Sequence, residues 1–180
     1  IFNDGHSYVA GNPNGDVTIV EFFDYNCGWC RKATPTILEL IENDPDIRIV
    51  FKEFPVRGKE SDEVSRMMVA VAKQGQYLPI HNQAMLAEGQ MDLARIEKMA
   101  KDAGLDMDKL QEDMASDEVT EILDTNFDIA QRLYLTGTPS FIVGDRIIRG
   151  WPGKENLLAM IDEVRNPPVV EELPPLEDEG

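Results

Sequence analysis

Two cysteines, Cys27 and Cys30, are the only ones among the 180 residues of this sequence. Gly28 and Trp29 separate them, at a point where an apolar strand pattern gives way to a helical pattern. Residues three apart share one face of a helix, so the two sulfurs can pair or separate with little backbone movement. A disulfide that closes so short a loop stabilises a fold only weakly. We therefore interpret the pair as a redox couple that exchanges two electrons through a mixed disulfide.

The first cysteine of the pair is expected to be the nucleophile. At a helix N-terminus, free backbone N–H groups and the positive end of the helix dipole favour the thiolate, which lowers the pKa of Cys27 below the free value of about 8.5. Arg31 and Lys32 add positive charge nearby. Cys30, one turn further along, is expected to be more buried and to resolve the mixed disulfide. The alternative is a pair of structural core cysteines.

The composition excludes several classes of function. The sequence holds 34 acidic against 17 basic residues, a net charge of −17, and such a surface repels nucleic acids and anionic lipid heads. A hydrophobic fraction of 42% supports the core of one domain. No apolar run approaches the roughly 20 residues of a membrane helix, so no membrane insertion is expected. The first residues lack the pattern of a signal peptide, and a leader removed earlier is the expectation.

The elements that position the cysteines alternate between strand and helix patterns. Residues 17–23 indicate a strand buried on both faces, as in a mostly parallel sheet. A helix then runs from the cysteines to Asp44-Pro45, and residues 47–51 form the next strand. This order predicts a parallel crossover unit. Tyr8-Val9 is a candidate edge strand.

The middle of the chain is predicted to be almost wholly helical. The expected helices cover residues 61–74, 77–87, 92–103, 106–115 and 117–135. Seven of the eight methionines fall in this block, and we interpret them as core residues that fill gaps. Beyond it, strands at 140–143 and 146–149 flank a turn of hairpin length, and a helix spans about 154–164.

Three segments carry a resemblance to a known family: residues 21–30, 51–55 and 136–140. With the order of elements, they resemble the DsbA-like family of bacterial periplasmic disulfide enzymes, and most of all its ScsC-like branch (suppressor of copper sensitivity protein C). The implied fold is α/β, a thioredoxin fold with an inserted all-helical subdomain. The predicted parts are an N-terminal extension at 1–16, a first thioredoxin-fold half with the CxxC at 17–58, the helical insertion at 59–128, a second half with the Thr-Pro loop at 129–165, and an acidic, proline-rich tail at 166–180.

The resemblance also implies roles for residues beyond the cysteines. The family places a buried carboxylate where Glu21 stands, which could relay the proton of Cys30; the alternative is a glutamate that points to solvent from an edge strand. Asp24 is a second candidate acid, interpreted mainly as a turn residue. Thr138-Pro139 resembles the family's cis-proline loop, which packs beside the CxxC and offers the backbone of residue 138 to an extended substrate.

The residues between the cysteines, Gly28 and Trp29, are expected to tune the redox potential. The founding member of the family has Pro-His there, and without that histidine a less oxidising disulfide is expected. Trp29 is either an exposed contact for unfolded substrates or a packed side chain. A threonine before the proline, together with Gly-aromatic in the CxxC, resembles disulfide isomerases more than the founding oxidase.

The function predicted from the resemblance is oxidation or isomerisation of disulfides in exported proteins, in the periplasm, with no cofactor. The expected partners are unfolded or misoxidised proteins and a membrane redox partner that resets the CxxC. Isomerase activity would require oligomers. A copper(I) carrier that uses the Cys27 and Cys30 thiolates as ligands is an alternative, because soft thiolates select that ion. A third possibility is an adaptor with a vestigial CxxC.

Overall fold

The computed structural model describes residues 1–167. In chain order its elements are β1 (Tyr8–Gly11), β2 (Val17–Phe23), α1 (Gly28–Asn43), β3 (Ile47–Glu53), α2 (Lys59–Lys73), α3 (Tyr77–Leu86), α4 (Leu93–Asp102), α5 (Met107–Met114), α6 (Asp117–Arg132), β4 (Ser140–Val143), β5 (Arg146–Arg149) and α7 (Lys154–Arg165). Nearly all of the acidic tail predicted at 166–180 lies outside the described residues.

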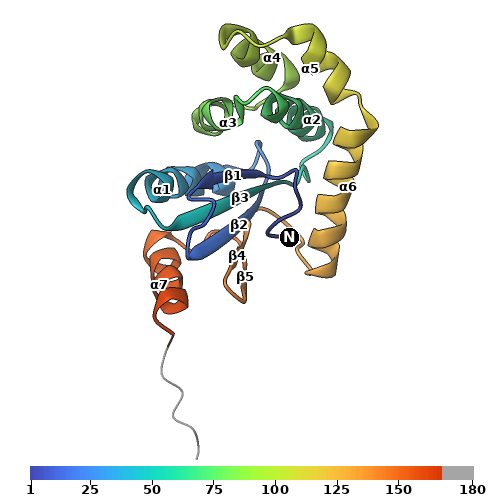
Figure 1. The fold of residues 1–180 in the computed structure, drawn as a ribbon. Helices are drawn as coiled ribbons and strands as arrows, with labels where there is room; N and C mark the ends of the chain where they lie inside the picture. The colour runs from blue at the N-terminus through green and yellow to red at the C-terminus, as the bar shows by residue number, and fades with distance from the viewer. Residues whose placement is uncertain (168–180) are drawn as a thin grey trace, which may run out of the picture.

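One mixed sheet with the strand order β1-β3-β2-β4-β5 forms the centre of the molecule (Figure 1). Its central strands β2 and β3 are parallel and are joined through α1, which confirms the predicted crossover unit. β4 pairs antiparallel with β2. β5 pairs antiparallel with β4, as the hairpin-length turn predicts. The edge strand predicted at Tyr8-Val9 is confirmed as β1, which pairs antiparallel with β3.

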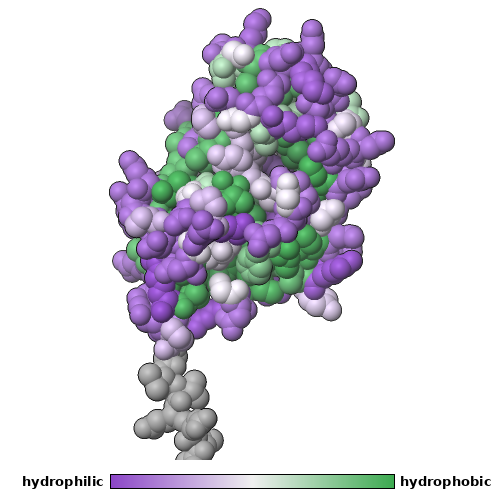
Figure 2. Space-filling view, in the orientation of Figure 1, coloured by the Kyte–Doolittle hydropathy of each residue, from purple (hydrophilic) through white to green (hydrophobic). Residues whose placement is uncertain are grey.

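The two faces of the sheet are covered differently. Alternate side chains of β2, among them Ile19 and Phe23, point into the main core with α1, α2, α3 and α7. The opposite face, with Val20 and Phe22, packs mainly against the end of α6. Figure 2 shows apolar surface over the sheet beside α6, whereas the surface of the helical insertion is mostly hydrophilic. Because side chains alternate along a strand, Glu21 lies on the face that α1 covers.

Helix α6 belongs to both parts of the fold (Figure 1). Its first half, with Val119 and Leu123, packs on Val69 of α2. Its last turn, with Ala130, packs on the sheet. The boundary predicted at residue 128 therefore falls within this continuous helix. Sequence patterns place helices well, but they do not show where one helix changes its packing partner.

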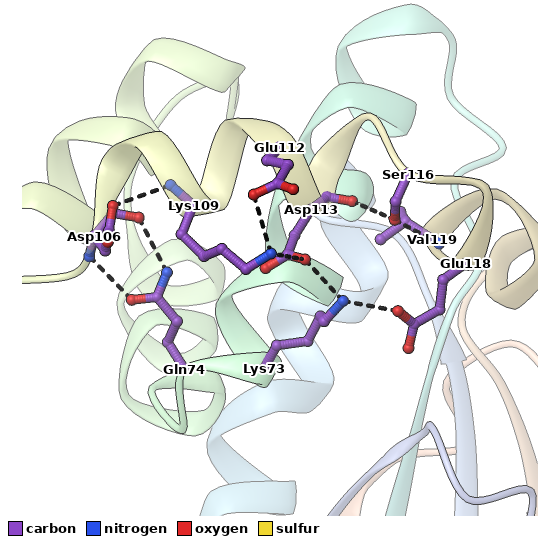
Figure 3. A network of polar contacts seen from close by, with 9 residues as sticks. All are labelled: Lys73, Gln74, Asp106, Lys109, Glu112, Asp113, Ser116, Glu118 and Val119. Carbon is purple, nitrogen blue, oxygen red and sulfur yellow. Dashed lines mark hydrogen bonds and ion pairs between the residues drawn. The ribbon is translucent and has the colours of Figure 1, made fainter.

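A buried acid holds the insertion together (Figure 3). The Asp113 carboxylate of α5 is only 4% exposed and lies 2.8 Å from Lys73 Nζ of α2 and 3.1 Å from Lys109 Nζ. The first of these contacts keeps the pKa of Asp113 below its ordinary value. Beside it, the amide of Gln74 exchanges two hydrogen bonds with the backbone of Asp106. These contacts join the last turn of α2 to α5.

The methionines of the insertion support the interpretation as core. Met67 is fully buried, whereas Met107 is only partly buried. Replacing Met67 with alanine should lower the free energy of unfolding by about 2–5 kcal/mol, because the cavity remains after the side chain is removed. Urea denaturation would measure this loss, with Met107→Ala as the matched control. Equal, small losses in both variants would contradict the core assignment.

Candidate active site

The two cysteines lie at the start of α1, as the sequence predicts. Both are free thiols without solvent-exposed surface. Cys27 is the N-cap residue, and its Sγ accepts a hydrogen bond from the backbone N–H of Cys30 at 3.4 Å. Sulfur thus satisfies one of the N–H groups that a helix leaves free at its start.

The pKa values of the two thiols are shifted in opposite directions. The hydrogen bond from the Cys30 thiol is the largest cause that lowers the pKa of Cys27, to about 5, and contacts from Thr138 and from backbone N–H groups add to it against the opposing effect of burial. Burial raises the pKa of Cys30 far above its ordinary range. At neutral pH, one sulfur is therefore ionised beside a neutral thiol.

The Thr138-Pro139 loop packs against the nucleophile. The Thr138–Pro139 peptide bond is cis, and the Thr138 carbonyl oxygen lies 3.2 Å from Cys27 Sγ. Two further hydrogen bonds hold the loop, from Gly150 N–H to the Pro139 carbonyl and from Ser140 Oγ to the Gly137 carbonyl. Segments more than 100 residues apart thus meet at one sulfur, 111 positions separating Cys27 from Thr138.

Glu21 lies in the core beneath the cysteines. It sits on the central strand β2 and is 3% exposed, so the alternative of a solvent-facing edge glutamate is wrong. Burial, with the negative charge of Cys27, raises the pKa of Glu21 from 4.5 to about 8. Its Oε1 has no hydrogen-bond partner within residues 1–167. One oxygen of this carboxyl is therefore free to accept a proton.

Asp24 does more than form a turn. Its carboxylate has no exposed surface and accepts hydrogen bonds from four donors in three segments. These donors are Asn26 N–H at 2.7 Å, Val56 N–H at 2.9 Å, Arg57 N–H at 3.0 Å and Ser61 Oγ at 2.8 Å. The acid thus fastens the turn before Cys27 to the loop after β3 and to the first turn of α2.

The loop after β3 brings a cation that the sequence analysis did not predict. Nη2 of Arg57 lies 3.9 Å from Cys27 Sγ. The only signal in the sequence is a basic residue shortly after the Phe54-Pro55 pair at the end of a predicted strand. A strand end that faces the start of α1 places such a residue near the cysteines, yet the loop conformation decides where its side chain lies.

The model of the family described as a DSBA-like thioredoxin domain matches residues 18–164. The chain belongs to this family. The predicted thioredoxin fold with a helical insertion is thereby confirmed, and so is the class of chemistry, thiol–disulfide oxidoreduction by a CxxC pair.

Solved structures of DSBA-like proteins match nearly the whole chain. A thioredoxin-like oxidoreductase from Silicibacter pomeroyi DSS-3 is 40% identical with a TM-score of 0.87, over 91% of this chain and 95% of that one. The catalytic domain of Proteus mirabilis ScsC is 26% identical with a TM-score of 0.81, over 90% of each chain. The latter agrees with the predicted resemblance to the ScsC-like branch.

Curated relatives of this DSBA-like chain include much longer proteins. The Na(+)/H(+) antiporter NhaA 3 of Salinispora tropica is 26% identical over 156 residues, which are 86% of this chain. These residues are 24% of the antiporter, so the chain spans about a quarter of the length of the curated relatives that it matches first. Within residues 1–167, no helix is both long enough and apolar enough to cross a membrane.

The side chains next to the DSBA-like CxxC lie in different environments. Trp29 is 57% exposed, so the alternative of a packed tryptophan is wrong. The Lys32 ammonium lies 4.7 Å from the centre of its ring, a cation–π contact. Arg31 donates hydrogen bonds to the carbonyls of Tyr25, Ala87 and Gly89, and its charge also interacts with that of Cys27, as predicted. Open space surrounds Gly28, whose tuning role stays a prediction.

A third buried acid, Glu53, lies in the main core outside the immediate contacts of the cysteines. It accepts hydrogen bonds from Tyr25, Tyr77 and Ser65 at 2.7–3.2 Å. Burial raises the pKa of Glu53 to about 7, against the effect of these donors. The Tyr25 hydroxyl also lies 3.0 Å from Nδ1 of the buried His81, whose pKa burial lowers to about 3. This cluster joins β3, the turn before Cys27, α2 and α3.

The described residues 1–167 contain no group of three or more His, Cys, Asp or Glu side chains suited to a metal ion. The copper(I) hypothesis therefore rests on the sulfurs of Cys27 and Cys30. It stays a prediction, which titration with copper(I) against a competing chelator would test: an affinity no tighter than that of a simple dithiol would contradict it.

The raised pKa of Glu21 predicts a pH-dependent stability. Because the folded protein binds this proton more tightly than the unfolded chain, the contribution is present below pH 4.5 and is lost as the pH rises through about 8. As the pH rises through this window, the free energy of unfolding of the wild type should therefore fall by about 1.4 kcal/mol per pH unit relative to that of Glu21→Gln. Urea denaturation of the reduced proteins would measure it. The exposed Glu42→Gln is the control, and parallel curves for wild type and Glu21→Gln would contradict the assignment.

Proposed function

We propose that this chain catalyses dithiol–disulfide exchange in exported proteins, with Cys27 as the nucleophile and Cys30 as the resolving thiol. The observation that carries the proposal is the arrangement of Cys27 as the N-cap of α1, the buried Cys30 one turn further along and the cis-proline loop against Cys27 Sγ, which favours an ionised Cys27 beside a neutral Cys30. Only a thiolate attacks a disulfide, so the sulfur with the lower pKa makes the first attack.

In the reducing direction, Cys27 attacks a substrate disulfide. One substrate sulfur forms the mixed disulfide with Cys27, and the other leaves as a thiolate. Cys30 then loses its proton, attacks Cys27 Sγ and releases the second substrate thiolate, which leaves a Cys27–Cys30 disulfide. Oxidation of a substrate is the reverse sequence: two electrons pass from the substrate dithiol to the protein disulfide.

Glu21 is the proposed proton acceptor for Cys30. A thiol with a strongly raised pKa cannot attack before it loses its proton. The charge of Glu21 contributes to the raised pKa of Cys30, so the two groups interact. The free Oε1 and the pKa of about 8 suit an acid that takes up and returns a proton near neutral pH. Its position beneath the cysteines excludes bulk water from this transfer.

Substrate binding is proposed at Trp29 and at the Thr138-Pro139 loop. An exposed indole next to the nucleophile offers apolar contact area to an unfolded chain. The loop brings backbone groups to the same sulfur, where an extended peptide could pair with residue 138. Unfolded or misoxidised periplasmic proteins are the proposed substrates, and a membrane redox partner is proposed to reset the CxxC.

The preferred direction depends on the redox potential. A stabilised Cys27 thiolate favours the reduced protein and hence an oxidase. The Gly-Trp dipeptide and Thr138 favour an isomerase by resemblance. Reduction of insulin, refolding of scrambled ribonuclease and a redox titration on the same preparation would separate these roles, and light scattering would give the oligomeric state that an isomerase requires.

The two cysteines should respond differently to substitution by serine. Cys27→Ser removes the attacking sulfur, so turnover of insulin should fall to the rate without protein. Cys30→Ser leaves the first attack intact but prevents resolution, so mixed disulfides should accumulate, visible on non-reducing gels. Retained turnover in Cys27→Ser would refute the proposed function.

A further inference from the structure

The guanidinium of Arg57 is the cation that contacts the nucleophile. Nη2 lies 3.9 Å from Cys27 Sγ, and within residues 1–167 Arg57 forms no ion pair with a carboxylate. The neighbouring cations are engaged elsewhere: Arg31 on backbone carbonyls and Lys32 on the Trp29 ring. Arg31 still adds charge near the sulfur, but the cation in direct contact with it comes from the loop between β3 and α2.

The loop that carries Arg57 is fixed relative to the sulfur. Buried Asp24 accepts the N–H groups of Val56 and Arg57 through Oδ2 and the N–H of Asn26 through Oδ1. One carboxylate thus holds the loop and the turn that leads into Cys27. Because these bonds use the backbone of Arg57, they position the residue without using its side chain.

We propose that Arg57 is the counter-ion of the Cys27 thiolate and a redox-tuning residue, which makes the Cys27–Cys30 disulfide more oxidising. The inference rests on the proposed function for its consequence, but its electrostatic basis is separate. Cys27 carries a negative charge only in the dithiol, because in a disulfide or mixed disulfide the same sulfur is neutral. A nearby cation therefore stabilises only the reduced state, and stabilising that state makes the disulfide a stronger oxidant.

Arg57 also changes the expectation from the CxxC dipeptide. Gly28 and Trp29 supply no cation, which taken alone predicts a weaker oxidant. A guanidinium from another loop supplies the positive charge. The other titratable groups that interact with Cys27 are Cys30 and Arg31 on α1 and Glu21 on β2. The pKa of Glu21 is raised to about 8, so this carboxyl is mostly neutral at neutral pH and its charge opposes the Cys27 thiolate only at higher pH.

The test compares Arg57→Gln with the wild type in two measurements. Ultraviolet absorbance of the thiolate gives the pKa of Cys27, which should rise by about half a pH unit, the size typical of a partly exposed ion pair. Equilibration with glutathione gives the second measurement. There the protein disulfide and two glutathione thiols yield the protein dithiol and glutathione disulfide, with one S–S bond broken, one formed and two electrons transferred. In Arg57→Gln, the equilibrium constant for the reverse reaction, oxidation of the protein dithiol by glutathione disulfide, should be about 2- to 5-fold larger than in the wild type.

Controls separate a local contact from general charge effects. In Arg57→Lys, both the pKa of Cys27 and the equilibrium constant with glutathione should return most of the way to the wild-type values. Lys98→Gln removes the same charge from an exposed site on α4, where Lys98 pairs with Asp102, and should change neither. In 1 M salt the screening length falls to about 3 Å, so the wild type should approach Arg57→Gln. This measurement on the unaltered protein tests the proposal even if a variant folds poorly.

The outcomes that overturn the proposal are specific. An unchanged Cys27 pKa in Arg57→Gln, an equal change in Lys98→Gln, or a difference that high salt leaves intact would each contradict a counter-ion role. The thiolate titration requires no catalysis. If the wild type failed to exchange with glutathione, the proposed function would fail, while the titration would still decide on Arg57.

Discussion

A charged sulfur without exposed surface is costly unless donors and positive charge surround it, and the segments around Cys27 meet this requirement together. The start of α1 supplies backbone N–H groups and the Cys30 thiol. The loop after β3 supplies the Arg57 guanidinium. The cis-proline loop also packs against the sulfur, but the Thr138 carbonyl is an acceptor, which pairs with the thiol and supplies no donor to the thiolate. These segments are distant in sequence, so the sheet order must bring the ends of β2, β3 and the loop before β4 together.

Three buried acids near this end of the sheet differ in the number of hydrogen bonds that their carboxyl groups accept. Asp24 accepts four hydrogen bonds, which replace the water that its charge loses on burial. Glu53 accepts three, and burial still raises its pKa to about 7. Glu21 keeps one oxygen without a partner, and its pKa rises further, to about 8. The number of donors thus divides these acids into a structural anchor and a candidate proton carrier.

The sequence predicts what depends on local pattern. Strand and helix periodicity and the CxxC at a strand–helix junction predicted the order of elements and the place of Cys27 and Cys30. The Thr138-Pro139 loop and the burial of Glu21 were implied by the resemblance to the family. Arg57 was missed because its contact depends on a loop conformation that Asp24 fixes across more than 30 positions. Arg31 adds positive charge near Cys27 as predicted, but its three carbonyl partners depend on the tertiary fold and could not be read from the sequence. Periodicity along one helix likewise cannot show that α6 packs on two cores.

The ties between the insertion and the turn before Cys27 bear on attempts to make a smaller enzyme from this fold. Ser61 donates to Asp24, and Asn26 exchanges hydrogen bonds with the backbone of Met91. Excising residues 59–128 to leave a minimal thioredoxin would remove these partners and leave an anionic carboxylate and an amide partly unsatisfied. The inserted segment therefore helps to hold the turn before Cys27 in place. A smaller version would need new hydrogen-bond partners for Asp24 and Asn26 in the connection that replaces residues 59–128.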